Sequence, residues 1–516
     1  MHPVLQTPEL LDQIFDLVPR SSLPSLARTC GVFFHPAACR LWARCDTLVD
    51  LARCLPESCW EGVDYTPGGV RMKITRQITV ADAQRVRIYA AFITYANLHE
   101  LEVAVAPSDI AQLADVMDGG YLLPNLRRLS YYATYQCPLS AILPLLLFPG
   151  LSVFMTGLWR SDPPSTMGLA GAAAEISAMS LLKARGTASI TSLTIGVDFG
   201  DVRVLIPWAE LLAGWDSLQF LDVAGDIDYA ASRSIANLPC LHTLALRSRH
   251  QPLPLLVPPR WRSSSTMRSL TIFGSLAASS VAYNHSFQQA PIENLSIMFV
   301  QDRSENPIQT ICRAVGQCCA VQSLTSFRLT PPYYSRVAED GPANEFTDIE
   351  PLLAFRRLTS LRIKSYRALS LRDEDMLRIA RMLPDLDTLE LWGNAWRPPK
   401  CTMLSLLHLA RYCPHLWDLT LAVDATEIRI PEAVPIDIVQ HSLKVFRVHR
   451  SPIGSEVAVA SFLLILFPRL RSIITEEPAG LDGDRQELRR CRSWLHVREA
   501  LAHLAVGFNL NGAADP

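Results

Sequence analysis

A short phrase of leucine-type residues, L-x-x-L-x-L, recurs through this 516-residue chain at intervals of about 23–39 residues. The clear copies begin at Leu218, Leu241, Leu358, Leu386 and Leu416, and the weaker copies begin at Leu98, Leu126, Ile190, Met267, Ile292, Leu324, Leu443 and Leu470. Such self-similarity is typical of repeat proteins, in which each unit buries its apolar face only against its neighbours. We therefore expect a solenoid, a fold that usually offers a binding surface rather than a catalytic pocket.

Each repeat also has a recurring order of helix, proline and strand. In one repeat, residues 376–383 have helical periodicity, Pro384 follows, and the leucine phrase begins at Leu386. Proline disfavours the helical state of the residue before it, so it ends the helix and releases the chain into a strand. Side chains alternate along a strand, so Leu389 and Leu391 are expected to face the core. The expected outward positions of this repeat are Thr388, Glu390 and Trp392.

The repeats resemble leucine-rich repeats in a long and irregular form, over about residues 91–480. That family places Asn or Cys three residues after the strand. Asn394 fits this slot, Asp226 and Asp424 substitute for it, and most other copies lack it, so we expect an uneven solenoid. The resemblance implies an α/β fold: a right-handed leucine-rich-repeat solenoid with parallel strands on the concave face and helices outside. The alternative is an ordinary leucine-rich α/β enzyme in which the phrase arises by chance.

The segment before the repeats has a different pattern, and we expect three short helices there. The first begins at Thr7-Pro8-Glu9 and ends at Pro19, the second spans residues 23–29, and the third runs from about residue 36 to 42. Three short helices make a poor core alone. Because their apolar residues cover two faces, we expect one face to form the core and the other to contact a partner.

This segment resembles an F-box, and is similar to the F-box domain-containing proteins of mushroom-forming fungi. The matching residues are Pro8-Glu9-Leu10-Leu11, Ile14-Phe15, Pro19, Leu23, Leu26, Thr29-Cys30, Phe33 or Phe34, and Leu41-Trp42. Gly31 stands where the family usually has Arg or Lys, and phenylalanine replaces a common tryptophan. The alternative is a helical cap, which every solenoid end needs.

The F-box resemblance implies a substrate-recognition adaptor of a Skp–cullin–F-box ubiquitin ligase. The module would dock the Skp-type adaptor of a cullin–RING ligase, the repeats would hold a protein substrate, and other subunits would carry out catalysis. The expected adaptor contacts are Pro8, Leu10, Leu11, Ile14, Leu23, Leu26 and Trp42. The alternatives are a free-standing cytosolic leucine-rich-repeat scaffold or inhibitor with no ubiquitin role and, third, an enzyme on a repeat frame.

Strand alternation in the C-terminal repeats suggests where a substrate would bind. The expected substrate-binding residues are Arg328, Arg362, Lys364, Glu390, Trp392, Arg447 and His449. In stacked strands these residues would form a basic strip, then an acidic and aromatic patch, then a second basic group. The basic strip would suit an acidic or phosphorylated segment of a substrate. The alternative is a solvated sheet face with no partner. Four segments break the repeat order and are candidate loops: 160–186, 247–266, 331–350 and 393–402. Insertions in solenoids often lie on the binding face.

The expected domains are an F-box-like helical module at 1–55, a linker or first cap at 56–90, an irregular leucine-rich-repeat solenoid at 91–480, and a C-terminal helical cap and tail at 481–516. The net charge of −2 does not indicate the excess of basic residues that is typical of nucleic-acid-binding proteins. Thirteen cysteines without C-x-x-C spacing give no zinc framework and suit a reducing compartment, so we expect a cytoplasmic or nuclear protein.

No catalytic residue, metal ligand or cofactor is expected, because phosphate-loop, G-x-S-x-G and H-E-x-x-H motifs are absent. Ser180 and Lys183 fit S-x-x-K, a pattern short enough to arise by chance. The N-terminus lacks the basic and apolar regions of a signal peptide. Residues 138–159 are uncharged over membrane-spanning length, but prolines interrupt them, so we expect a buried repeat and no membrane partner.

Overall fold

The structure, a computed structural model, describes only part of the chain. The described residues are 7–66, 69–99, 105–117, 120–133, 143–158, 176–177, 179–184, 189–196, 207–224, 227, 229–247, 266–275, 291–300, 306–331, 342–393, 397–428, 438–449, 451–475 and 489–501. They fall into two compact units, Met1–Leu241 and His242–Pro516. Asn394 and Asp226, two residues expected in the polar slot of the repeat consensus, lie outside the described residues, as do most of the insertions at 160–186 and 247–266.

Six parallel strands follow one another in the first unit. They are β1 (Arg44–Cys45), β4 (Tyr95–His99), β5 (Arg128–Ala133), β6 (Val153–Leu158), β7 (Ser192–Gly196) and β8 (Phe220–Ala224). The helices between and around them are α4 (Leu48–Ala52), α5 (Gln84–Ala90), α6 (Pro107–Asp115), α7 (Leu143–Leu146), α9 (Trp208–Leu212) and α10 (Tyr229–Ala236). The uncharged stretch at 138–159 contributes α7 and β6, and no described helix is long and apolar enough to cross a membrane.

Three helices precede these strands: α1 (Pro8–Asp16), α2 (Leu23–Thr29) and α3 (Gly31–Trp42). The second has the predicted bounds, and the third begins earlier than the predicted start near residue 36. Phe33 accounts for the difference, because it packs on the module core and its ring lies 5.7 Å from that of Phe15. This tertiary contact favours helix on both sides of Pro36, a residue that sequence reasoning takes as a helix start.

A hairpin stands in the segment expected to be a linker or first cap. It consists of antiparallel strands β2 (Trp60–Thr66) and β3 (Gly69–Ile74), and α5 follows it in the same segment. The sheet begins even earlier, because β1 pairs with β4 directly after α3. The helical module is therefore continuous with the first strands of the solenoid.

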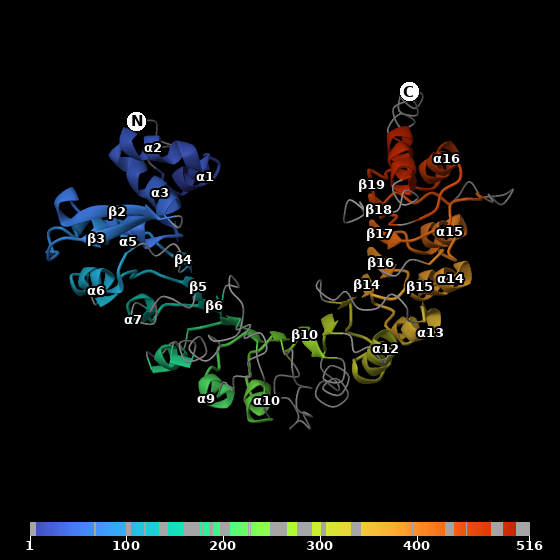
Figure 1. Cartoon of the computed structure of the whole chain (residues 1–516), viewed down its shortest axis with the longest axis horizontal. Helices are drawn as coiled ribbons and strands as arrows, with labels where there is room; N and C mark the ends of the chain where they lie inside the picture. Colours follow the sequence, from blue (N-terminus) through green and yellow to red (C-terminus); the bar gives the residue numbers. More distant parts are fainter. Residues whose placement is uncertain are drawn as a thin grey trace. The chain divides into compact units, whose positions relative to one another are not determined.

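Nine further parallel strands make the sheet of the second unit, fifteen described strands in all (Figure 1). They are β9 (Thr243–Arg247), β10 (Ser269–Ser275), β11 (Asn294–Val300), β12 (Ser326–Thr330), β14 (Ser360–Ser365), β16 (Thr388–Gly393), β17 (Asp418–Leu421), β18 (Val445–Arg447) and β19 (Ser472–Ile474). Two short strands, β13 (Asn344–Glu345) and β15 (Leu369–Ser370), form a separate parallel pair. Neighbouring strands from β9 to β19 of this sheet pair in parallel, as a solenoid requires.

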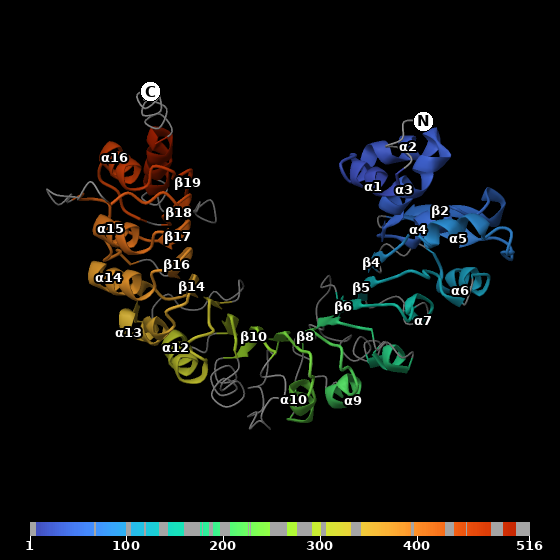
Figure 2. The same cartoon turned by 180° about the vertical axis from the view of Figure 1, so that it is seen from behind.

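Helices cover one side of this second sheet, as both views show (Figures 1 and 2). They are α12 (Pro307–Cys318), α13 (Phe346–Ile349), α14 (Asp373–Met382), α15 (Met403–Tyr412) and α16 (Glu456–Leu466), followed by a helix at 489–501. The predicted order of helix, proline and strand is confirmed in the repeat at α14, Pro384 and β16. The same order recurs at α15, Pro414 and β17.

A ladder of inward side chains forms the core of the second unit. Leu361, Leu389, Leu419, Phe446 and Ile473 are in register on five successive strands, and each is almost completely buried. Burying one such side chain contributes about 1.5–3 kcal/mol relative to leaving it exposed. The inward positions predicted from the leucine phrase are thus confirmed, and the fold is an α/β solenoid of the leucine-rich-repeat type.

Candidate functional site

The outward side chains of the C-terminal strands form a continuous rung. Arg328 is in register with Arg362, Arg362 with Glu390, Glu390 with Thr420, and Thr420 with Arg447. Neighbouring strands lie about 4.8 Å apart, so side chains on this rung can touch. The structure therefore brings together five positions that are spread over about 120 residues of sequence.

Ion pairs neutralise much of the charge on this face. Lys364 Nζ lies 3.0 Å from Glu390 Oε1, and Arg447 pairs with the buried carboxylate of Asp418. Thr388, Asp418 and Thr420 occupy outward positions in their strands and are nevertheless buried. In the described part of the chain, the arginines of the predicted basic strip that carry no ion pair are Arg328 and Arg362.

An aromatic pair extends this face beyond the ends of the strands. The rings of Trp392 and His449 stack with centroids 5.2 Å apart and 27° between their planes. The Lys364 ammonium lies over the Trp392 ring of this pair, with Nζ 5.7 Å from the ring centroid. Trp392 is the next-to-last residue of β16 and His449 follows β18. The strand register places Ala422, just after the intervening β17, between them, and this small side chain leaves room for the two rings to meet.

His449 is held in an uncommon backbone conformation. Its φ of 43° is positive, and it is the only positive φ of a non-glycine residue in the described part of the chain. Residues other than Gly, Asn, Asp and His seldom adopt such a conformation. The following turn is fixed by Ser451, whose Oγ accepts a hydrogen bond from the Val423 N–H at 2.9 Å. Ser451 also accepts one from Trp494 Nε1–H through its carbonyl oxygen at 2.9 Å.

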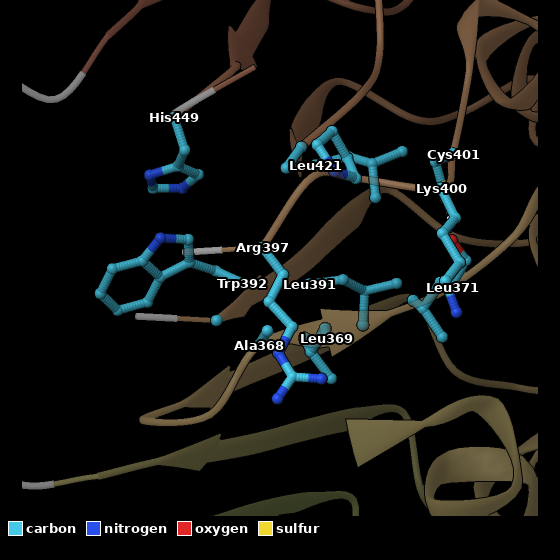
Figure 3. Close-up of a pocket in the computed structure, with 13 residues that line it drawn as sticks. Ala368, Leu369, Leu371, Leu391, Trp392, Arg397, Lys400, Cys401, Leu421 and His449 are labelled. Atoms are coloured by element: carbon cyan, nitrogen blue, oxygen red, sulfur yellow. Dashed lines mark hydrogen bonds between the residues drawn. The ribbon is translucent and has the colours of Figure 1, made fainter. Parts of the chain in front are cut away.

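A small cavity opens beside the aromatic pair, at the carboxyl ends of β16 and β17 (Figure 3). Its volume is about 50 Å³. The apolar lining residues are Ala368, Leu369, Leu371, Leu391, Pro399, Leu421 and Ala422, and the polar or aromatic ones are Trp392, Arg397, Lys400, Cys401 and His449. Arg397 and Lys400 were not among the expected site residues. Both lie in the predicted insertion at 393–402, so the break in the repeat order was the signal that could have found them.

Burial controls the chemistry of the cavity's thiol. The Cys401 side chain is buried, and desolvation raises its pKa to about 12. Its Sγ donates a hydrogen bond to the Leu371 carbonyl oxygen at 3.2 Å. A thiol in this state is a poor nucleophile and a poor metal ligand. Among the residues that the structure describes, no group of three or more His, Cys, Asp or Glu side chains could hold a metal ion.

The expected adaptor contacts divide into two sets in the N-terminal module. Leu11 and Leu23 are buried in the module core, and Leu26 packs against it. Trp42 stacks on Tyr89 of α5, with ring centroids 4.6 Å apart, so it joins the module to the first repeats. Pro8, Leu10 and Ile14 are exposed. Only the exposed set is available to a partner in this conformation.

Helix α1 therefore carries two apolar stripes. Leu11 and Phe15 point into the core, whereas Leu10, Ile14 and Leu17 are 39%, 40% and 87% exposed. The spacing of the second set, i, i+4 and i+7, places them on one side of the helix. No sequence rule distinguished the two stripes, because both consist of large apolar residues; the position of α3 decides which one is covered.

The orientation of α1 is fixed by a charged residue of α3. Arg40 Nη1 lies 3.1 Å from Asp12 Oδ1, and its Nη2 lies 2.7 Å from Asp16 Oδ1. The same guanidinium lies 6.0 Å from the Phe15 ring centroid. These contacts hold the core stripe of α1 against α3 and leave the outer stripe in solvent.

The repeated strands, the covering helices and the ladder of buried leucines define the class of this protein as a leucine-rich-repeat solenoid. No protein-family model matches the sequence, and no curated protein matches it. Among solved structures, the chain is similar to an LRR protein of Leptospira interrogans, with 14% sequence identity and a TM-score of 0.34. That likeness covers 69% of this chain and 78% of the other.

Proposed function

We propose that this protein is the substrate-recognition adaptor of a Skp–cullin–F-box ubiquitin ligase. The N-terminal module would dock the Skp-type adaptor subunit, and the solenoid would hold a protein substrate for ubiquitin transfer by other subunits. This proposal rests on the F-box resemblance of residues 8–42 and on a repeat fold suited to protein binding. Such a function would be carried out in the cytoplasm or nucleus.

One observation carries the proposal: the exposed apolar stripe of Leu10, Ile14 and Leu17 on α1. A solenoid cap needs a polar outer face, because nothing stacks beyond it. This module caps the first repeats through Trp42 and Phe34, whose rings meet Tyr89, so its capping role is filled by α3. The stripe on α1 has no part in that role, and a partner helix of matching apolar surface would cover it.

The test uses the full-length chain with the double substitution Leu10→Asp and Ile14→Asp. Both side chains are exposed, so the fold should be retained, while two charges in the stripe should abolish binding to a Skp-type adaptor in co-purification. The matched control is Val457→Asp with Ile465→Asp, an exposed apolar pair on α16. That variant should bind the adaptor as the wild type does.

Two outcomes would contradict the proposal: a wild-type chain that does not co-purify with the adaptor, or a double variant that binds as well as the wild type. The first outcome would favour the second candidate function, a free-standing scaffold or inhibitor, whereas the second would show that the α1 stripe is not the adaptor contact. The stacking of Trp42 on Tyr89, a contact that a cap on the first repeats would make, supports this alternative. Circular dichroism on each variant separates lost binding from lost folding.

A further inference from the structure

We propose that Arg328 of β12 and Arg362 of β14 bind two carboxylates of an acidic segment in a bound polypeptide. The two arginines are in register on neighbouring strands, and both belong to the second unit. This inference deepens the proposed function, because it rests on the solenoid as the protein-binding part and names the chemical class of its ligand.

The first support is that two positive charges lie side by side on the outward face of the sheet. Neighbouring strands are about 4.8 Å apart, so the side chains of residues in register can touch. Like charges in this position destabilise a sheet, and within the described residues neither arginine forms an ion pair. Arrangements that cost stability in this way are expected at sites that serve a function.

The second support is a hydrogen-bond donor that has no acceptor. Arg362 is half-buried, and its Nε–H is buried without a hydrogen-bond partner among the described residues. Such a donor costs free energy, and folded proteins seldom leave one unsatisfied. An anionic ligand that draws the guanidinium group outward would supply the missing acceptor through a charge-assisted hydrogen bond.

The third support is the balance of charge around the two arginines. Glu390 of β16 is in register with Arg362, but its carboxylate lies 3.0 Å from Lys364 Nζ, which neutralises it. On the outward faces of β12, β14 and β16, three cations therefore share one carboxylate. The positive charge that remains favours an anionic ligand.

Small side chains leave the two guanidinium groups accessible. Ser326 and Ser360 are the preceding outward residues of β12 and β14, and Ser296 lies beside Arg328 on β11. A serine is too short to cover the end of an arginine side chain, and Arg328 is exposed. A ligand can therefore approach both arginines from the outward face of the sheet.

Geometry favours two carboxylates over one phosphate group. Each guanidinium presents a planar fork that pairs with a carboxylate through two parallel hydrogen bonds. Alternate side chains of an extended peptide point the same way and lie about 6.6 Å apart, a spacing that long side chains on neighbouring strands can match. A doubly charged phosphate held between the arginines would lie nearer to Glu390 than a carboxylate bound at Arg328 does, and like charges repel.

The experiment measures fluorescence anisotropy of short labelled peptides with the purified full-length chain and no adaptor subunit. Three degenerate peptide mixtures differ at two alternate central positions, which hold two glutamates, two glutamines, or one phosphoserine and one serine. We expect the glutamate mixture to bind at least about tenfold more tightly than the glutamine mixture, and at least as tightly as the phosphoserine mixture. The preference for glutamate should weaken as the salt concentration rises, because salt screens exposed charges.

Arg328→Gln and Arg362→Gln should each reduce the preference for glutamate by about fivefold or more, and the double variant should lose it. Arg328→Gln should not lower the thermal midpoint, because the side chain is exposed and its loss removes a contact between like charges. The matched control is Arg411→Gln, an exposed arginine on α15, which should keep the wild-type preference. Circular dichroism checks that each variant is folded.

Equal binding of the glutamate and glutamine mixtures, no binding of any mixture, or a wild-type preference in the double variant would each overturn the inference. Tighter binding of the phosphoserine mixture than of the glutamate mixture would overturn the assignment to carboxylates and indicate a phosphorylated segment. Because no adaptor subunit is present, a chain that fails to bind such an adaptor can still show the glutamate preference. Conversely, a chain that docks the adaptor without this preference refutes the arginine site and leaves the proposed function standing.

Discussion

Trp392 and His449 stack across an intervening strand, with ring centroids 5.2 Å apart. Trp392 lies near the end of β16 and His449 follows β18, and the two rings would not meet if Ala422 between them were large. The pair ties three repeats together on the outer face of the sheet. It also borders the small cavity at the carboxyl ends of β16 and β17.

The ring stack and the positive φ of His449 predict an unusual order of stability for two variants at this position. His449→Gly removes the strained φ together with the stack, whereas His449→Ala removes the stack and keeps the strain. The alanine variant should therefore be less stable than the glycine variant by about 1 kcal/mol. At Arg378, an exposed position inside α14, the order should reverse, because glycine is the poorer helix former by about 1 kcal/mol. Urea unfolding of the four variants tests both rankings.

Gly393 at the end of β16 should not tolerate a side chain. A Cβ there would lie 2.5 Å from the Arg367 carbonyl oxygen and 2.7 Å from the Leu369 amide nitrogen. Both are backbone atoms, so Gly393→Ala should destabilise the second unit by about 1–3 kcal/mol. Gly31→Ala is the control, since no atom lies within 4 Å of its Cβ position. A Gly393 variant with the wild-type thermal midpoint would contradict this close approach.

Asp82 should make the first unit sensitive to acid. The Arg76 guanidinium donates to both of its carboxylate oxygens, at 2.8 and 2.9 Å, and Thr79 donates from its hydroxyl and backbone N–H. The Arg76 hydrogen bond, more than any other contact, holds the pKa of Asp82 well below its usual range. The unfolded chain has the ordinary pKa of about 3.9. The carboxylate's stabilising effect is therefore complete above that pH and is lost as the pH falls towards the folded-state pKa.

The corresponding experiment compares the wild type with Asp82→Asn by denaturant unfolding between neutral pH and pH 3. The stability difference should be largest at neutral pH and should shrink as the pH falls, because Asp82 takes up a proton in the unfolded wild-type chain before it does in the folded one. Arg76→Gln should show the same trend. A difference that stays constant over this range would show that the pair does not perturb the carboxyl group.

Buried cysteines should be slow to react. Burial raises the pKa of Cys401 and of Cys413 to about 12, whereas Cys240 is exposed. Alkylation requires the thiolate, so iodoacetamide at pH 8 should modify Cys240 well before the other two thiols. Peptide mapping by mass spectrometry follows each site. Equal rates at Cys240 and Cys413 would show that the second unit opens on the timescale of the reaction.

Much of the fold could be predicted because its signals are local. The leucine phrase identified the inward ladder, including Leu389 and Leu391, and proline marked where α14 gives way to β16. Two elements escaped prediction. The hairpin β2–β3 has no leucine phrase, and the early start of α3 depends on Phe33 packing on Phe15. Neither feature follows from periodicity, since both depend on contacts between segments distant in sequence.

By itself the sequence determined the repeat class, the order of helix and strand, and which leucines are buried, because these follow from the period of apolar residues and from the steric effect of proline. Only the tertiary structure decided which side chains remain exposed and unneutralised, and so accessible to a partner. The stacking of the repeats pairs Glu390 with Lys364 and Asp418 with Arg447. Helix α3 covers one stripe of α1 and leaves Leu10 in solvent. Charge pairing and coverage depend on distances between repeats, and a one-dimensional pattern does not contain those distances.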